Sequence, residues 1–273
     1  MTSTTRRVGD YEIIILNDGP FKSGADTLVH ANGPEAHKRL LEKQGDEIIV
    51  FDVNLFALHG PNGITLIDAG TGPGFNPALG QSRAEMQAHG ITPESVDRIF
   101  LTHLHFDHSR GLLEGDDAYF PRAEVFIPAI ELAFYTSEDA RLALPDARRG
   151  AFPITDKILK AYAGRVRPFL PGTIAPGITT VSLPGHTMGQ TGFVLDDGRE
   201  KLVFWGDCLH MSKLQTEDPD VSTIYDYDPK LAASTRRWML ERAVNENWVV
   251  AGSHLTGFGK VARKGSAYEI LPA

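Results

Sequence analysis

The chain has 273 residues, of which 42% are hydrophobic and 23% charged, and this balance excludes an intrinsically disordered protein. Its formal net charge of -8 argues against a nucleic-acid partner, because affinity for nucleic acid comes largely from Lys and Arg side chains that neutralise phosphates. The single cysteine, Cys208, excludes an internal disulfide, so we expect a reduced, cytoplasmic setting.

We expect neither an export signal nor a membrane-spanning segment. Arg6 and Arg7 are followed by Asp10 and Glu12, where a secretion signal would have its apolar region. No uncharged apolar run approaches the length of about 20 residues that a membrane-spanning helix needs. The sequence therefore predicts no membrane partner.

The first half of the chain predicts strands followed by helices. Residues 20–46 are rich in Gly, Pro and charge, and we expect a flexible or helical excursion there that could cap a site. Apolar alternation, turn residues and the stop at Gly90 define the other elements. These are a strand at 11–16, a hairpin of 47–60 and 64–70 about Pro61-Asn62-Gly63, a glycine-rich turn at 70–74, a helix at 83–90 and a buried strand at 96–103.

The second half repeats this order of strands and then helix. No sequence repeat, linker or low-complexity tract separates the halves, so we expect one α/β domain over 1–273, with two packed sheets covered by helices. The expected elements are a strand at 178–185, a hairpin over 190–207 that turns at Asp197-Gly198, an amphipathic helix at 228–247 and a strand at 248–254.

The run His103-Leu104-His105-Phe106-Asp107-His108 carries the strongest chemical signal. In an extended His-x-His segment the two imidazoles point the same way and can bind one ion, and Asp107 and His108 follow where the chain bends. A surface cluster of histidines is the alternative explanation. Metal binding is favoured because three more residues of ligand type end expected strands, where α/β enzymes place their chemistry: His186, Asp207 and His254.

Four segments resemble, in order and spacing, the successive metal motifs of the metallo-β-lactamase superfamily: THLHFDH, LPGHTMGQTGF, KLVFWGD and GSHLTGFG. Within that superfamily the chain is most similar to the methyl parathion hydrolase-like and acyl-homoserine lactonase-like branch. That similarity extends over nearly the whole chain, through LNDG, NLFAL, LIDAG, EDPDVSTIYDYDPK and the closing GFGKV to YEILP. The resemblance implies a four-layer αββα sandwich with a dinuclear metal site at one edge.

The resemblance also implies how the ligands divide between two divalent ions. His103, His105 and His186 would hold one ion, Asp107, His108 and His254 would hold the other, and Asp207 would bridge them. Nitrogen and oxygen ligands suit zinc, which is our first expectation, and also iron, manganese or cobalt. Relatives commonly have GHTPGH where this chain has GHTMGQ, so Gln190 replaces a histidine that is not a primary ligand.

Such a centre predicts hydrolysis. Two cations roughly 3.5 to 4 Å apart lower the pKa of a shared water towards neutrality and so supply a metal-bridging hydroxide as nucleophile. One ion polarises the substrate oxygen and the other stabilises the leaving oxygen. We expect cleavage of small apolar esters or lactones, with organophosphate triesters as further candidates, and we expect Asp107 to relay a proton to the leaving group.

Further site residues follow from positional resemblance. His210 falls where related acyl-homoserine lactonases have a tyrosine that assists at the substrate carbonyl, so we expect it to donate to the oxyanion or to a metal ligand. Phe75, Tyr135 and Phe152 are candidates for the walls of an apolar pocket, although core packing explains each of them equally well. Cys208 is expected to pack beneath the site without a chemical role. Relatives also suggest a homodimer.

Other functions remain open on the sequence alone. A glyoxalase II-like thioester hydrolase shares the metal motifs, but such proteins have an added helical region, and 19 residues follow His254 here. β-Lactam hydrolysis is another candidate, although the arrangement of Asp107 and Asp207 resembles the other hydrolase branches. A mononuclear iron dioxygenase would use the same ligands. A purely structural metal is disfavoured, because it calls for a closed four-ligand site, commonly with Cys.

Overall fold

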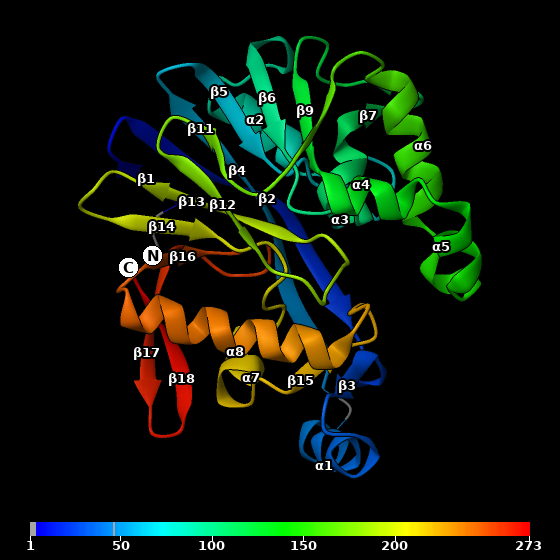
Figure 1. Ribbon diagram of the computed structural model, residues 1–273, viewed down its shortest axis with the longest axis vertical. Helices are drawn as coiled ribbons and strands as arrows, with labels where there is room; N and C mark the ends of the chain where they lie inside the picture. Colours follow the sequence, from blue (N-terminus) through cyan, green and yellow to red (C-terminus); the bar gives the residue numbers. More distant parts are fainter. Residues whose placement is uncertain (1–3, 46) are drawn as a thin grey trace.

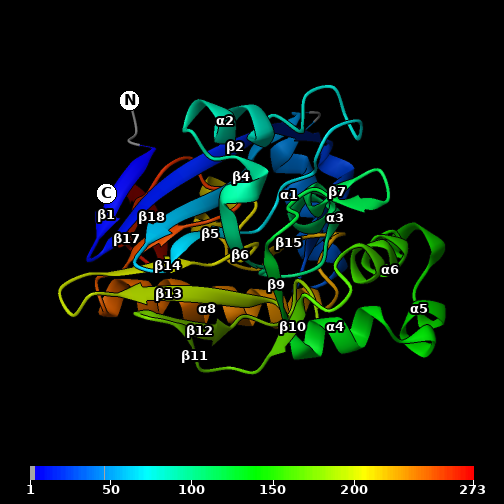
Figure 2. The same ribbon diagram turned by 90° about the horizontal axis from the view of Figure 1, so that it is seen from above.

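Two mixed seven-stranded sheets form the centre of the computed structural model, which describes residues 4–45 and 47–273. The sheets pack face to face, and helices cover the outer face of each (Figure 1). Seen from above, α2 (Ser82–Ala88) lies on the far side of the first sheet from the second sheet (Figure 2). The predicted four-layer αββα sandwich is therefore confirmed.

Both faces of the first sheet are buried, because its strands are almost continuously apolar. In its second strand, Ile13 and Ile15 face the other sheet, while Ile14 and Leu16 face the helices, because successive side chains alternate between the faces. Its strands, in spatial order, are β1 (Thr5–Val8), β2 (Tyr11–Ser23), β4 (Ile49–Gly60), β5 (Gly63–Ile67), β6 (Val96–Phe100), β9 (Glu124–Pro128) and β10 (Val166–Phe169).

The second sheet packs against the first through aromatic side chains and carries a long helix on its other face. Phe193 and Phe204 meet Phe56 and Phe100 between the sheets, and Met239 of α8 (Pro229–Asn245) packs on the outer face. The strands, in spatial order, are β11 (Thr173–Ala175), β12 (Ile178–Ser182), β13 (Thr191–Asp196), β14 (Lys201–Phe204), β16 (Val249–Ala251), β17 (Gly259–Lys264) and β18 (Ala267–Pro272).

Shorter elements complete the described chain. Two small antiparallel ladders join β3 (Leu28–His30) to β15 (Val221–Thr223) and β7 (Leu113–Glu114) to β8 (Asp117–Ala118). The remaining helices are α1 (Pro34–Gln44), α3 (Phe106–Ser109), α4 (Ala129–Tyr135), α5 (Glu138–Ala143), α6 (Ala151–Ala161) and α7 (Ser212–Glu217), with 3-10 turns η1 (Ala25–Thr27), η2 (Pro93–Ser95), η3 (Arg110–Leu112) and η4 (Asp146–Arg148). None of the helices in the described ranges has both the length and the apolar character that crossing a membrane requires.

The predicted strands, hairpins and helices are present with ends shifted by a few residues, but the segment 20–46 is only partly as expected. Its helical part is α1, and residue 46 lies outside the described residues. Residues 20–23 instead continue β2, which pairs with β4 so that Phe21 lies opposite Phe51. Pairing with a long neighbouring strand overrides the local Gly and Pro content, which the sequence pattern does not reveal.

The N-terminus of α8 provides a test of how local chemistry stabilises the fold. Asp228 is its N-cap, and Oδ1 accepts hydrogen bonds from Lys230 N and Leu231 N, both at 3.0 Å. We expect Asp228→Ala to lower the free energy of unfolding by about 1 kcal/mol, because two backbone donors lose their acceptor. Urea denaturation at constant metal content measures the change. Asp228→Ser, which keeps a capping oxygen, should recover most of it, and equal stabilities of the two variants would contradict the assignment.

Candidate metal centre

The structure brings the seven predicted ligands together at one edge of the two sheets. All of them lie on loops or in the short helix α3 that follow the ends of strands β6, β12, β14 and β16. The ligand atoms of His103, His105 and His186 lie within 4.8 Å of one another, and those of Asp107, His108, Asp207 and His254 form a second such set. These are the two groups that the resemblance implies, although no ion tests their role as ligands.

Asp207 lies between the two sets. Its Oδ2 is 3.3 Å from His186 Nε2 and 3.0 Å from His254 Nε2, and its Oδ1 is 3.1 Å from His108 Nε2. The carboxylate is buried, with 2% of its surface exposed. One carboxylate with each oxygen turned to different imidazoles is the geometry that a bridging ligand requires.

The outer nitrogens of three imidazoles are fixed by oxygen acceptors. His108 Nδ1 is 2.8 Å from Asp68 Oδ2, His186 Nδ1 is 2.8 Å from Asp226 Oδ1, and His254 Nδ1 is 2.7 Å from the carbonyl oxygen of Asp52. Because these oxygens accept, each Nδ1 donates its proton, and each Nε2 is left to face the cluster. This is the arrangement that protein histidines adopt when they bind metal ions.

Asp68 occupies a strained position that this role explains. It follows β5 with φ of 64°, in the left-handed region that residues other than glycine rarely adopt. In that conformation its carboxylate accepts hydrogen bonds from Thr102 N at 2.8 Å and from His108 Nδ1. Asp68 thus connects the loop after β6 to the loop after β5. The sequence analysis noted LIDAG only as a point of resemblance, and a backbone angle leaves no signal in the residue pattern.

Charges within the cluster favour the protonation states that bind cations. Burial, and next the neighbouring His108, holds the pKa of His103 well below its usual value, and burial and His186 lower the pKa of His105 to about 3. Burial opposes ionisation of Asp107, but the charge and hydrogen bond of His108, with the charge of His254, together outweigh it, and the pKa falls to about 2. At neutral pH these two imidazoles are neutral and Asp107 is ionised.

His108 and His254 respond differently because Asp207 is close to both. Burial opposes protonation of each imidazole, but the nearby carboxylates, Asp207 first and then Asp107, together outweigh it and raise both pKa values. Positive charge is therefore favoured next to Asp207. A bound cation supplies that charge without a proton on either ring.

Unsatisfied buried atoms show that the cluster fits metal ions. His103 Nε2, His108 Nε2 and Asp207 Oδ1 are all buried, and none makes a hydrogen bond to the described residues. Leaving one such atom without a partner costs roughly 1 to 3 kcal/mol. One of them belongs to the first ligand set and two to the second, and with nitrogen and oxygen donors throughout the two sets fit divalent cations. Cys208 takes no part, since its side chain packs against the core near Met239 and burial raises its pKa to about 12.

Glu131 of α4 ties together the two loops that carry the first ligand set. Its fully buried carboxylate accepts a hydrogen bond from Leu104 N at 3.0 Å through Oε1, and from Thr187 Oγ1 and Gly189 N, both at 2.8 Å, through Oε2. Leu104 lies between His103 and His105, and Thr187 follows His186. A Cβ atom on Gly189 would lie 2.4 Å from Glu131 N, so the close approach requires glycine. The sequence analysis missed Glu131.

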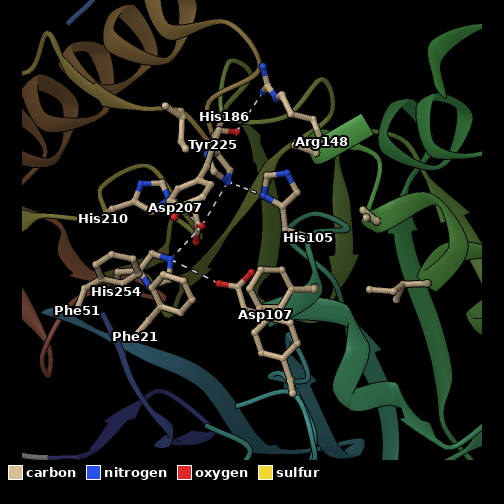
Figure 3. Close-up of a pocket in the computed structure, with 17 residues that line it drawn as sticks. Phe21, Phe51, His105, Asp107, Arg148, His186, Asp207, His210, Tyr225 and His254 are labelled. Carbon is tan, nitrogen blue, oxygen red and sulfur yellow. Dashed lines mark hydrogen bonds and ion pairs between the residues drawn. The ribbon is translucent and has the colours of Figure 1, made fainter. Parts of the chain in front are cut away.

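A cavity of about 470 Å³ opens over the cluster (Figure 3). Two aromatic pairs line it: Phe21 and Phe51 with ring centroids 5.3 Å apart, and Phe75 and Phe106 with ring centroids 4.3 Å apart. His105, Asp107, His186, Asp207, His210 and His254 also line it. A small molecule in this cavity would reach the candidate metal ligands directly.

The three aromatic residues considered for this cavity have different places. Phe75 lines it and is 47% exposed. Tyr135 and Phe152 do not line it. They are buried in the core between the first sheet and its helices, with ring centroids 5.0 Å apart. Their apolar neighbours come from elements that are distant in the sequence. Resemblance by position along the chain therefore cannot show that the two side chains pack in the core instead of lining the cavity. Phe21, Phe51 and Phe106 are the wall residues that the sequence analysis missed.

His210 lies in the cavity wall beside Asp207. Its Nε2 is 3.2 Å from Asp207 Oδ2, and its ring stacks on His254 with centroids 4.8 Å apart. Burial lowers its pKa, against the opposing effect of Asp207. Its Nδ1 is buried and makes no hydrogen bond with the part of the chain that the structure describes. The side chain is therefore next to the candidate metal ligands and has one buried nitrogen without a hydrogen-bond partner among the described residues.

Comparison with known families and curated proteins gives consistent results. The family model described as "Metallo-beta-lactamase superfamily" matches residues 48–254. Two proteins named as probable metallo-hydrolases, from Mycobacterium bovis and Mycobacterium tuberculosis, are each 24% identical over 172 residues, which is 55% of this chain and 54% of theirs. The chain thus spans about half the length of the curated relatives it matches.

Solved structures resemble the chain over nearly its full length. The hydrolase AbOPH of the β-lactamase superfamily is 28% identical with a TM-score of 0.88, and the alignment covers 100% of this chain and 97% of that chain. The dizinc quorum-quenching lactonase AidC, solved with a homoserine product, is 25% identical with a TM-score of 0.85, covering 98% and 96%. A probable metal-dependent hydrolase from Staphylococcus aureus, 22% identical with a TM-score of 0.77 and coverage of 98% and 99%, shares the fold.

Glu131→Gln provides a test of the metal centre that does not depend on any substrate. A glutamine has one acceptor oxygen and one NH2 group, so in either orientation its NH2 group faces a backbone N–H, that of Leu104 or that of Gly189. We expect the affinity for one ion of the two, the one held by His103, His105 and His186, to fall about 10- to 100-fold. Metal content per chain, measured by elemental analysis across a chelator series, reports the loss.

Glu138→Gln is the matched control, because Glu138 pairs with Arg141 on the exposed surface of α5. It should retain both ions with unchanged affinity. Parallel loss of both ions from Glu131→Gln, or retention of both, would contradict the role of Glu131.

Proposed function

The chain belongs to the metallo-β-lactamase superfamily, and from this membership we propose that it is a dinuclear metal-dependent hydrolase of small apolar esters or lactones, with organophosphate triesters as further candidate substrates. One observation carries the proposal, namely that two sets of imidazole and carboxylate ligands share Asp207 at the floor of an open cavity. Structural metal sites are closed, whereas an open face is what catalysis needs.

The roles of the chain's own residues follow from their places. Two divalent ions, when bound, would supply a water of lowered pKa and polarise the substrate oxygen. Asp207 holds the two ligand sets together. Asp107 lies in the cavity wall and is ionised at neutral pH, so its carboxylate can accept a proton from water and pass it to the leaving oxygen. No side chain needs to form a covalent bond with the substrate.

The cavity and the structural neighbours support an ester or lactone as substrate. Phe21 and Phe51 offer an apolar wall beside the ligands, and Phe75 with Phe106 offers another, as small-molecule sites commonly do. AidC, whose fold matches over nearly the whole chain, is named as a lactonase and was solved with N-hexanoyl-L-homoserine as product. We propose zinc as the native metal, because AidC is a dizinc protein and the donors here are nitrogen and oxygen.

We also propose that the chain is a single domain, works in the cytoplasm, forms a homodimer and binds neither nucleic acid nor membranes. The net charge of -8 supports the absence of a nucleic-acid partner, the single buried cysteine supports the cytoplasmic setting, and the homodimer rests on resemblance. Light scattering on the metal-loaded protein measures the oligomeric state.

The function is tested with a substrate panel of aryl esters, acyl lactones and paraoxon-like triesters. We expect the metal-loaded protein to hydrolyse at least one ester or lactone, with two ions per chain by elemental analysis. Asp207→Ala should bind fewer than two ions and fall to the background rate, since it removes the ligand that the two sets share. Turnover equal to that of Asp207→Ala would refute the proposal. One iron per chain together with oxygen consumption would favour the dioxygenase alternative.

His210 has a test of its own. We propose that its Nε2, which faces Asp207 Oδ2 at 3.2 Å and so carries the ring proton, donates to the substrate oxygen as negative charge develops there. His210→Phe keeps a flat ring against His254 but removes the donor, and we expect kcat to fall about 100-fold while two ions stay bound. Steady-state kinetics with parallel metal analysis measures both. Loss of an ion would make His210 a metal ligand instead, and an unchanged kcat would remove it from the mechanism.

A further inference from the structure

Arg148 is the single Lys or Arg side chain among the described residues that line the cavity. It ends the 3-10 turn η4, and its side chain is half-buried. Figure 3 shows it on the same side of the cavity as Tyr225 and His186, whereas Phe21 and Phe51 lie at the opposite end of the view. The other ionised groups in the wall, Asp107 and Asp207, are candidate metal ligands. Arg148 is therefore the wall residue whose charge the metal centre does not use.

The hydrogen bonds of Arg148 leave much of its guanidinium free. Nη2 donates to the carbonyl oxygen of Asp226 at 2.9 Å and to that of Tyr225 at 3.4 Å. A guanidinium has five N–H donors, so three remain, and within the described ranges of the chain no acceptor is found for them. The two backbone contacts hold the group in place without neutralising its charge.

Arg148 differs in this respect from two arginines near it in the chain. Arg141 pairs with Glu138, and Arg149 pairs with Asp146, each three residues earlier in the chain. Arg148 forms no ion pair with any carboxylate of the described chain. A partly buried charge without a partner is unfavourable, and an anion in the cavity would relieve that cost.

Asp226 connects Arg148 to the metal centre. Its carbonyl oxygen accepts the hydrogen bond from Arg148, and its carboxylate oxygen Oδ1 lies 2.8 Å from His186 Nδ1. The guanidinium is thus fixed to the residue that orients a candidate ligand. A substrate whose carbonyl lies at the metal centre can place an apolar part against Phe21 and Phe51 and a negatively charged part at Arg148.

We propose that Arg148 forms an anion-binding subsite, and that the preferred substrates are small esters or lactones that carry a carboxylate away from the scissile bond. This inference rests on the proposed hydrolase function and narrows its substrate class. It distinguishes this chain from a hydrolase of wholly neutral substrates, for which an unpaired arginine in the wall would bring no gain in binding.

The test compares two substrates that differ by one methyl group, which removes the negative charge: the mono-para-nitrophenyl ester of glutaric acid and the methyl ester of its free carboxyl group, each rate corrected for hydrolysis without protein. We expect the metal-loaded protein to have the higher kcat/KM for the anionic ester. In Arg148→Met the ratio of the two kcat/KM values should shift towards the neutral ester by about 10-fold or more, through KM rather than kcat, since a charge-assisted hydrogen bond is lost. Elemental analysis and circular dichroism, with two ions per chain and an unaltered spectrum expected, show that this variant is folded and metal-loaded.

Arg141→Met is the matched control, because it removes the same charge from the same segment on the exposed side. It should leave the ratio unchanged. If Arg148→Met changes hydrolysis of both esters by the same factor, or if Arg141→Met shifts the ratio equally, the subsite is refuted while the hydrolase function stands. If the unaltered protein hydrolyses no ester or lactone, the hydrolase function is refuted and the subsite with it.

Discussion

The buried carboxylate of Asp207 sets the constraint on which the rest of this structure depends. It has imidazoles on both sides, and two of these have raised pKa values because the carboxylate is so near. An arrangement of this kind is stable only if positive charge is present and if every imidazole is held in one orientation. The second condition explains the surrounding residues, because Asp68, Asp226 and the carbonyl of Asp52 each fix one Nδ1. Much of the loop structure at this edge serves that purpose.

The packing of the two sheets brings the loops that carry the candidate ligands close together. Strands β6, β12, β14 and β16 belong to two different sheets, and their ends meet because aromatic side chains lock the sheets face to face. The ligands then need only short loops, and the loops are tied to one another rather than to solvent. Glu131 joins the loops after β6 and β12, and Asp68 joins the loops after β5 and β6. Packing far from the centre therefore fixes distances within it.

The sequence pattern predicted the fold and which seven candidate ligands lie together, but it predicted the walls of the cavity poorly, for a physical reason. The candidate ligands are of residue types that few other roles require in this order, and they follow recognisable strands. Phe21, Phe51, Tyr135 and Phe152 are all aromatic, and which of them lines the cavity depends on pairing between β2 and β4 and on helix packing. Nothing in the local sequence distinguishes Glu131 and Asp226 from the other acidic residues of the chain. Glu131 acts through contacts with residues 27 and 58 positions away in the chain, and Asp226 acts through a contact with a residue 40 positions away.

The floor of the cavity and much of its wall come from different parts of the chain, and this affects substrate specificity. Its floor consists of side chains that the metal centre constrains, and these can change little without loss of an ion. Part of its walls comes from the end of β2, the start of β4 and the segment around η4, none of which carries a candidate ligand, whereas Phe106 lies between the candidate ligands His105 and Asp107 in the chain. Phe21, Phe51 and Arg148 can therefore vary with the substrate while the centre stays intact. Arg148 differs from the two phenylalanines because it is connected to the metal centre. Its guanidinium donates to the carbonyl of Asp226, and the carboxylate of Asp226 orients His186, so charge at the wall can affect that residue. Binding of an anion at this wall and the position of that imidazole are consequently linked through a single residue.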